Sequence, residues 1–328
     1  MDKLMSMIQN NRIFMTGGAG FIGTKLCRGL ADNNKIFIYD KLLRNSIKQT
    51  NLLEHENVKL IEGDVFNLPY LQQIIIEIKP NIIIHMAAVA GIDTVIKSPS
   101  TTMKVNMIGT YHVLEAVKPH VSGLKRFINF STSEVFGDYA YKAEEFRSTN
   151  LAPVGEARWT YSVSKLAAEH LVHSYYKEFG LPAVNLRPFN IYGPGQVGEG
   201  AIHGFVNKAV SNQEIQIHGD GDQIRSWCYI DDMVQGVLLC LEKKEAVGNV
   251  FNIGNPRGTT TINDLAEKIV RLADSKSRIV HIPKTYVDIE LRMPSIEKAK
   301  ELLGYMPKID LNEGLKRTIA WYRNQVTV

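Results

Sequence analysis

Short runs of apolar residues recur along the first half of the chain, and segments with the periodicity of amphipathic helices lie between them. Strands that are buried on both faces of a parallel sheet are apolar at nearly every position, as these runs are. Six strands are therefore predicted, at 12–16, 35–39, 58–63, 81–86, 126–131 and 182–187. Longer helices are expected around 102–117 and around 157–179. This alternation predicts an α/β fold with a doubly wound parallel sheet.

The pattern changes after Arg187. A glycine-rich loop over 190–200 is followed by shorter helix, strand and turn segments, including a helix at 232–244. A further helix is expected to begin at Thr261, because Thr261 and Asp264 have the spacing of a capping box. We expect a sheet domain over 12–187 and a smaller C-terminal α/β domain over 188–328, with some C-terminal segments returning to the first sheet.

The composition narrows the class of protein. Of the 328 residues, 45% are hydrophobic and 22% are charged, as in soluble globular proteins. No apolar run approaches the ~18 residues of a membrane-spanning helix, and the N-terminal eleven residues are expected to be a frayed leader rather than a secretory signal. The three cysteines have no metal-ligand spacing and predict buried thiols in a reducing compartment, which we take to be the cytoplasm.

Charge and histidine spacing argue against two further classes. The net charge of +4 is spread along the chain, which gives little support to nucleic-acid binding. The nine histidines form no H-x-x-x-H pattern and no histidine–carboxylate cluster, so no metal site is expected. The same charge balance would suit a few arginines placed for an anionic small molecule.

A glycine-rich turn lies between the first strand and the helix that follows it. The sequence T-G-G-A-G-F-I-G places Gly17, Gly20 and Gly23 there, with Phe21 and Ile22 between the last two. Glycine permits a tight turn and a close approach of the backbone to a pyrophosphate, and a helix N-terminus offers unpaired N–H groups. This context predicts a dinucleotide-binding turn.

Acidic residues follow the next two strands. Asp40 ends the second strand, where its carboxylate can accept a hydrogen bond from a ribose 2′-hydroxyl and would repel a 2′-phosphate. The cofactor is therefore predicted to be NAD rather than NADP. Asp64 and Val65, after the third strand, are expected to be further cofactor contacts, although Asp64 could equally be a simple turn carboxylate.

Tyr161 and Lys165 lie four residues apart on a predicted helix and hence on one face of it. A tyrosine is a poor base at neutral pH, because its pKa is ordinarily about 10. An ammonium one turn away and a positive nicotinamide ring would stabilise the phenolate. Tyr161 could then take a proton from a sugar or alcohol hydroxyl while a hydride passes to NAD.

Together these motifs resemble the extended short-chain dehydrogenase/reductases, specifically the NAD-dependent nucleotide-sugar epimerase/dehydratase family. The resemblance runs over 12–322 and includes H-M-A-A at 85–88, S-T-S-E-V-F-G at 131–137, L-R-P-F-N-I-Y-G-P-G at 186–195 and R-M-P-S-I-E-K-A at 292–299. It implies a Rossmann-type sheet domain, a nucleotide-sugar-binding C-terminal domain, and a homodimer formed through the helices around 102–118 and 157–179.

The resemblance also implies roles for individual residues. Ala87 and Ala88 should line the cofactor, and Thr132 should be the hydroxyl partner of Tyr161. The residues expected to bind a UDP-sugar substrate are Asn190, Arg225 and Arg292. A guanidinium fork suits a phosphate better than a point charge does.

The triplet Thr132–Ser133–Glu134 bears on the reaction. All members of the family first oxidise C4 of the sugar, and an epimerase needs no second base. Glu134 matches the base with which sugar 4,6-dehydratases remove the C5 proton, but Ser133 replaces their aspartate acid. UDP-glucuronate decarboxylases and UDP-N-acetylhexosamine 5,6-dehydratases tolerate that change.

We favour a lyase that dehydrates a UDP-hexosamine such as UDP-GlcNAc, with Thr132, Ser133, Glu134, Tyr161 and Lys165 as its catalytic residues. The alternatives are a UDP-sugar 4-epimerase, a UDP-glucuronate decarboxylase, and a simple ketone reductase that would release NADH. Glu134 could also be a carboxylate that only holds a loop.

Overall fold

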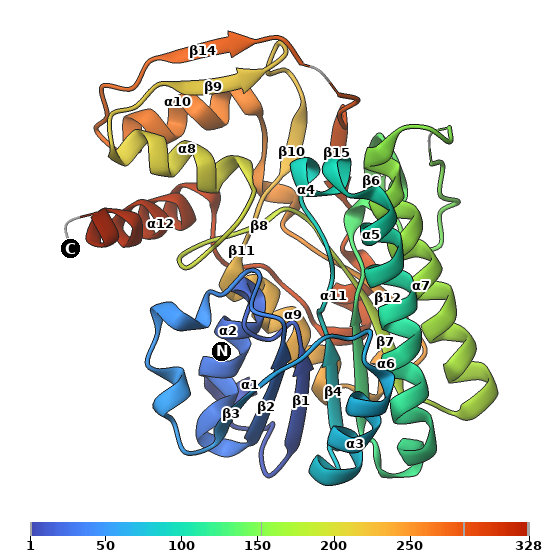
Figure 1. Ribbon diagram of the computed structural model, residues 1–328. Helices are drawn as coiled ribbons and strands as arrows, with labels where there is room; N and C mark the ends of the chain where they lie inside the picture. Colours follow the sequence, from blue (N-terminus) through green and yellow to red (C-terminus); the bar gives the residue numbers. More distant parts are fainter. Residues whose placement is uncertain (1, 152, 285, 327–328) are drawn as a thin grey trace.

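The computed structural model describes residues 2–151, 153–284 and 286–326. Its largest element is a seven-stranded parallel sheet with the strand order β12-β7-β5-β4-β1-β2-β3 (Figure 1). The strands are β1 (Arg12–Thr16), β2 (Lys35–Asp40), β3 (Val58–Glu62), β4 (Ile82–His85), β5 (Arg126–Phe130), β7 (Ala183–Pro188) and β12 (Val250–Ile253). The six predicted strands are confirmed, with ends that differ by at most one residue. The seventh, β12, comes from the C-terminal half and pairs with β7.

Helices cover both faces of this sheet. On one face, α2 (Phe21–Leu30), α9 (Ile230–Glu242) and α11 (Glu297–Leu303) contribute buried residues to one apolar cluster. On the other, α3 (Leu68–Ile78), α6 (Gly109–Val117) and α7 (Ala157–Phe179) contribute to a second cluster. The helix predicted around 102–117 consists of α5 (Pro99–Met103), one π-helical stretch (Lys104–Ile108) and α6. The shorter α4 (Ile92–Lys97) precedes α5.

The strand order reverses beside β1, which pairs with β2 on one side and with β4 on the other. The connections that follow β1 and β4 therefore run to opposite faces of the sheet and leave a crevice at the carboxyl ends of these two strands. Ligands of doubly wound sheets bind in such a crevice. The glycine-rich turn lies at this point, between β1 and α2.

A third apolar cluster lies in the C-terminal half, at the top of Figure 1. It includes residues of α8 (Ala201–Val210), α10 (Ile262–Leu272) and α12 (Leu311–Val326), and of the parallel pair β9 (Ile215–His218) and β14 (Ile279–Ile282). Thr261 caps α10, because its hydroxyl oxygen accepts a hydrogen bond from the Asp264 N–H at 3.0 Å. This N-cap was predicted from the sequence.

Two small sheets connect the halves of the chain. One has the order β13 (Thr259–Thr261), β10 (Ile224–Ser226), β15 (Leu291–Pro294) and β6 (Tyr139–Ala143). The other pairs β8 (Ile191–Tyr192) with β11 (Cys228–Tyr229). Because β6 and β12 each join a sheet made mostly by the other half, the chain crosses between the halves more than once, and the 187/188 division remains a prediction.

The N-terminal residues differ from the frayed leader that was expected. Residues Asp2–Met5 form a short helix, α1, and Leu4 and Met5 pack against the first apolar cluster. Ile8 is itself buried. Three apolar side chains within five residues give this segment enough hydrophobic contact to be held against the sheet domain.

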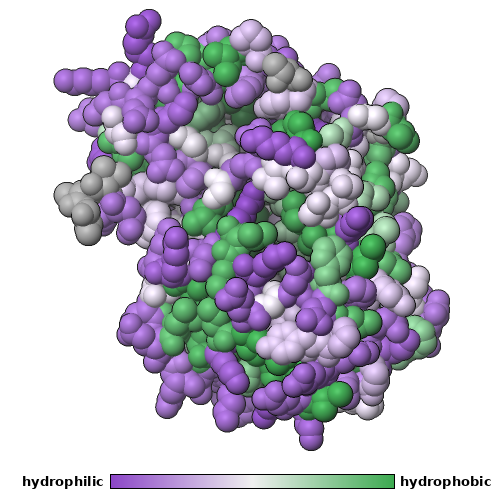
Figure 2. Space-filling view, viewed as in Figure 1, coloured by the Kyte–Doolittle hydropathy of each residue, from purple (hydrophilic) through white to green (hydrophobic). Residues whose placement is uncertain are grey.

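Most polar side chains lie at the surface. In Figure 2 hydrophilic residues cover much of the visible face, with smaller groups of hydrophobic residues between them. All three cysteines are buried and unpaired, as predicted. Of the helices in the described part of the chain, none is long and apolar enough to cross a membrane, and no group of three or more potential metal ligands occurs among the described residues.

Candidate active site

The turn after β1 requires glycine at two positions. Gly17 has a φ of +70°, and a Cβ there would lie 2.6 Å from the backbone nitrogen of Ala87. A Cβ at Gly23 would lie 2.4 Å from the carbonyl oxygen of Gly18. Gly20 is the N-cap of α2, and no side chain caps that helix. The turn therefore brings the backbone close to the end of β4 and leaves the N-terminus of α2 free to face an anion.

Asp40 is fixed by the same turn. Its carboxylate accepts hydrogen bonds from the Ala19 N–H at 3.0 Å and from the Leu42 N–H at 2.7 Å. Burial raises the pKa of Asp40, and these backbone hydrogen bonds oppose the rise. The carboxylate keeps lone pairs that a ribose hydroxyl could use.

The other predicted cofactor contacts lie around this turn. Phe21 and Ile22 are partly buried and pack against the C-terminal apolar cluster. Asp64 forms an ion pair with Lys41 at 2.7 Å, and its other oxygen accepts the Phe66 N–H. Burial alone would raise the pKa of Asp64, but the hydrogen bonds from Lys41 and Phe66 give a net lowering. Val65 is buried against Gly109 of α6.

Replacing Asp40 with alanine is expected to weaken NAD binding by about 10- to 100-fold, since a hydrogen bond to a charged group contributes about 1.5–3 kcal/mol. Discrimination against NADP should relax, because the charge that repels a 2′-phosphate is lost. Titration of the cofactor-free protein with NAD and NADP measures both effects. Asp32→Ala, which removes a carboxylate that is 83% exposed, is the control. An unchanged cofactor preference in Asp40→Ala would contradict the assignment.

The end of β4 is held by a buried hydrogen-bond chain. The Thr16 hydroxyl lies 2.6 Å from His85 Nδ1, and His85 Nε2 lies 2.9 Å from the Thr110 hydroxyl. Thr110 donates its own proton to the Asn106 carbonyl, so Nε2 of His85 must be the donor to Thr110. Burial lowers the pKa of His85 to about 3, which keeps the ring neutral. This histidine therefore has a structural role. The hydrogen bonds that it makes hold the end of β4 so that Ala87 lies beside Gly17, while Ala88 is exposed.

Tyr161 and Lys165 lie one turn apart on α7, as predicted. The Thr132 side chain lies close enough to the Tyr161 phenol to oppose the rise of its pKa, and the Thr132 hydroxyl oxygen accepts the Glu134 N–H at 3.2 Å. Burial and the charge of Glu134 raise the pKa of Tyr161, while Thr132 and Arg44 oppose the rise. The lowering of this pKa by Lys165 and a bound nicotinamide ring remains a prediction for the cofactor-bound protein. Burial also lowers the pKa of Lys165, to about 8.

Glu134 lies in the short 3₁₀ helix Ser133–Phe136 at the end of β5, and arginines surround it. The distance from its Oε1 to Arg158 Nη2 is 3.7 Å, and that to Arg292 Nη1 is 3.9 Å. The Glu134 side chain is 24% exposed, whereas that of Arg158 is only 6% exposed. Ser133 is buried. The Glu134 carboxylate is therefore partly accessible to a ligand and also lies near the guanidinium groups of two arginines.

The two predicted arginines are neighbours on paired strands. Arg225 of β10 lies opposite Arg292 of β15 in the sheet register. Arg225 Nη2 donates to the Ile289 carbonyl and lies 3.2 Å from Asp288 Oδ1. Arg292 donates to the Gly137 carbonyl, and burial lowers the pKa of Arg292 to about 9.

Asn190 occupies a constrained position beside this strand pair. Its backbone φ is +43°, a left-handed conformation that asparagine tolerates better than most residues. Its side-chain amide donates to the Ser226 carbonyl at 2.9 Å. The proposed diphosphate contact would therefore have to use its second amide hydrogen.

Arg158 and Asp288 complete the cluster and were not predicted from the sequence. Arg158 Nη1 lies 3.1 Å from Asp288 Oδ1, so Asp288 bridges Arg158 and Arg225. Nε of Arg158 is buried and has no hydrogen-bond partner in the described structure, and the Nη1 contact with Asp288 is an ion pair without hydrogen-bond geometry. One signal was available: Arg158 lies three residues before Tyr161 and hence on the same side of α7.

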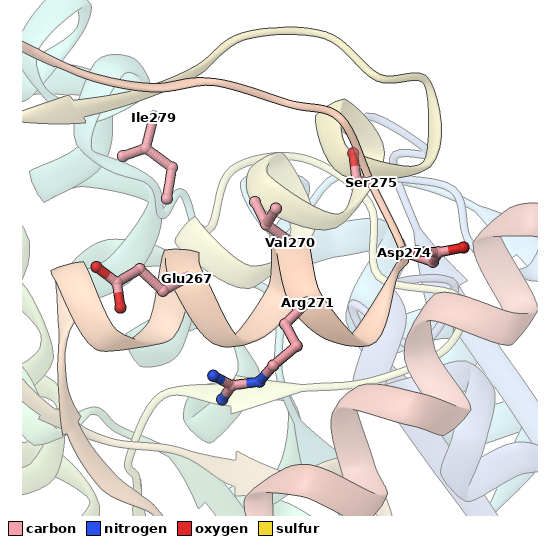
Figure 3. A pocket seen from close by; sticks show the side chains of 6 residues that line it. All are labelled: Glu267, Val270, Arg271, Asp274, Ser275 and Ile279. Carbon is pink, nitrogen blue, oxygen red and sulfur yellow. The ribbon is translucent and has the colours of Figure 1, made fainter.

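A hollow of about 340 Å³ lies elsewhere, on the surface of the C-terminal half (Figure 3). It is lined by Glu267, Val270, Arg271, Asp274, Ser275 and Ile279. None of these belongs to the cluster around Tyr161 and Glu134. This hollow is therefore not part of the candidate active site.

A parallel sheet with a dinucleotide-binding turn at its switch point, and a Thr–Tyr–Lys group beside that turn, defines an NAD-dependent enzyme of the short-chain dehydrogenase/reductase class. The chain belongs to the NAD-dependent epimerase/dehydratase family, whose model matches residues 13–254. The arrangement of Gly17, Gly23, the free α2 N-terminus and Asp40 fits NAD.

Relatives with three different reactions are similar over nearly the whole chain. A dTDP-D-glucose 4,6-dehydratase of Dictyostelium discoideum is 37% identical over 95% of this chain and 82% of its own. A UDP-N-acetyl-alpha-D-glucosaminuronate decarboxylase of Bacillus cytotoxicus is 30% identical over 95% of this chain and 98% of its own. The solved UDP-glucose 4-epimerase of Thermotoga maritima is 30% identical, with a TM-score of 0.87 and coverage of 96% and 99%. The family and the cofactor are thereby established, and the protein is a nucleotide-sugar-modifying enzyme.

Proposed function

We propose that the protein is a nucleotide-sugar dehydratase that oxidises C4 of UDP-GlcNAc or a related UDP-hexose and then eliminates water across C5 and C6. The observation that carries this proposal is the place of Glu134. Its carboxylate lies close enough to Tyr161 to raise the pKa of that phenol, and its side chain is accessible to a ligand. An epimerase, which only returns hydride to the other face of C4, has no use for such a carboxylate.

In the proposed reaction each proton has a place. Tyr161, close to Thr132 and one turn from Lys165, accepts the proton of the C4 hydroxyl. Bound NAD supplies the acceptor and later the donor of hydride. The resulting ketone acidifies the C5 hydrogen, and Glu134 accepts that proton.

The leaving hydroxyl needs a proton that Ser133 is too weak an acid to give. The proton that Glu134 takes from C5 can return to the C6 hydroxyl as the C6–O bond breaks, so that water leaves and one carboxyl group serves both steps. The nearby guanidiniums of Arg158 and Arg292 hold Glu134 in place for both transfers.

A second candidate reaction is decarboxylation of a UDP-hexuronate, and the arginine cluster favours it. Arg158, Arg225 and Arg292 bring three positive charges against the two carboxylates of Glu134 and Asp288. The surplus positive charge would suit a C6 carboxylate. A 4-keto acid loses carbon dioxide without a leaving hydroxyl, so Ser133 would be no obstacle.

Incubation with UDP-GlcNAc, UDP-glucose and UDP-glucuronate, each followed by mass spectrometry, separates these reactions. The proposal expects loss of one water from UDP-GlcNAc or UDP-glucose without net release of NADH. Loss of carbon dioxide from UDP-glucuronate would establish the second candidate instead. A product of unchanged mass would identify an epimerase, and stoichiometric NADH would identify a simple dehydrogenase.

We further propose that Asn190, Arg225 and Arg292 of the C-terminal domain bind the UDP-sugar.

We also propose that the enzyme is a cytoplasmic homodimer that pairs through α6 and α7. Tyr111 and Phe179 of these helices are each 43% exposed. Tyr175 of α7 donates to Glu115 of α6, which joins the helices into one face. Light scattering should then give twice the 36.9 kDa of one chain, and a mass of one chain would reject the dimer.

A further inference from the structure

Lys165 lacks the ion-pair partner that a buried ammonium normally has. The residue is 2% exposed, and no carboxylate of the described residues lies within ion-pair distance of it. The acid with the strongest effect on it is Glu169, one turn further along α7. Lysine and glutamate at this spacing on a helix ordinarily pair, so something must keep Glu169 away from Lys165.

Arg187 of β7 binds Glu169 instead. Its Nε donates to Glu169 Oε1 at 2.8 Å and its Nη2 donates to Oε2 at 2.7 Å, which occupies both carboxylate oxygens. Both side chains are 5% exposed. The Arg187 guanidinium also donates from Nη1 to the Glu145 carbonyl and lies over the Phe136 ring, 4.8 Å from its centroid. These three contacts fix the position of the Arg187 guanidinium.

We propose that Arg187 is a positioning residue for catalysis: by holding Glu169 in a bidentate fork, it leaves the Lys165 ammonium free to act on Tyr161 and on the cofactor. A buried carboxylate without a cation costs several kcal/mol. If Arg187 were absent, Glu169 would draw Lys165 towards itself, and the positive charge beside Tyr161 would be neutralised. The inference concerns C4 oxidation, which the family's reactions share, and does not depend on the later chemistry at C5 and C6.

The other ionisable groups around these residues do not replace this arrangement. His85 of β4 faces Lys165 and stays neutral. Glu134 and Arg44 act on Tyr161 from the Ser133–Phe136 turn and from the loop after β2, with opposite effects. Glu145 and Lys298 are the other charged groups that interact with Arg187. None of these groups appreciably affects the pKa of Lys165; the charged group that does is Glu169.

The test is the titration of Tyr161 in the NAD-bound protein, followed as phenolate absorbance, which requires no substrate. Each variant is measured against the same variant carrying Tyr161→Phe, so that the difference isolates this tyrosine. In Arg187→Met the titration should move to higher pH by about one unit or more, as expected when a nearby opposite charge is lost. In the double variant Glu169→Gln/Arg187→Met it should return to the wild-type position, because Lys165 regains its free charge.

The double variant leaves neither charge unpaired, so it remains foldable even if Arg187→Met is too unstable to study. In that case Arg187→Lys, which keeps the charge but not the fork, replaces the single variant and should show a smaller shift in the same direction. An unchanged Tyr161 titration in the single variant would reduce Arg187 to a structural link between α7 and β7. A shift that persists undiminished in the double variant would equally overturn the proposal. Neither outcome would affect the mass-spectrometric test of the overall reaction.

Discussion

Tyr161→Phe is expected to abolish turnover, with a loss of about 10²- to 10⁴-fold or more, while NAD remains bound. A positioned acid–base group ordinarily contributes an effect of this size. The phenylalanine ring preserves the packing on α7 and removes only the hydroxyl, whose pKa Thr132 and Glu134 influence. The measurement is the turnover number with the active UDP-sugar, together with the NAD content of the purified variant.

Tyr175→Phe is the matched control for this variant. Tyr175 lies on the same helix, and its hydroxyl bonds to Glu115 rather than to any group of the site. We expect nearly full activity in Tyr175→Phe. If Tyr161→Phe also retained activity, Tyr161 could not be the base for C4 oxidation, and the assignment of the Thr–Tyr–Lys group would be wrong.

The fold could be predicted well because its signals are local. Each central strand is an apolar run between turns, so the strands were placed to within one residue. The glycine turn and the Tyr161–Lys165 spacing are likewise contained in short segments. In contrast, β12 has only four residues and joins the sheet from the C-terminal half. Nothing in four residues specifies which strand they will pair with, so long-range contacts decide it.

The same limit applies to the charges of the site. Arg158, Arg225 and Arg292 come from three separate elements, and Asp288 links two of them. Sequence motifs identified Arg225 and Arg292 but could not show that Arg158 and Arg292 lie beside Glu134 or that Arg225 shares Asp288 with Arg158. The burial of Tyr161, which raises its pKa in the cofactor-free protein, could not be predicted either, because spacing on a helix reveals the neighbouring ammonium but not the surroundings of the phenol.

Glu134→Gln is expected to separate C4 oxidation from the later chemistry at C5. The amide cannot accept the C5 proton, so product formation should fall by about 10²- to 10⁴-fold. Oxidation should persist and be visible as NADH absorbance after mixing with substrate. Its pH dependence should also change in a defined direction. Because the charge of Glu134 raises the pKa of Tyr161, removing that charge should lower this pKa and extend oxidation to lower pH.

Stopped-flow absorbance across a pH series measures both effects in one experiment, and Glu144→Gln, at an exposed position ten residues away, is the control. The amide also gives up the ion pairs with Arg158 and Arg292, at 3.7 and 3.9 Å. A general loss of site structure would therefore suppress the NADH signal along with the product. Persistent NADH with blocked product thus identifies Glu134 as the group that acts at C5. Full activity in Glu134→Gln would instead indicate that the enzyme is an epimerase and that Glu134 only orders the neighbouring arginines.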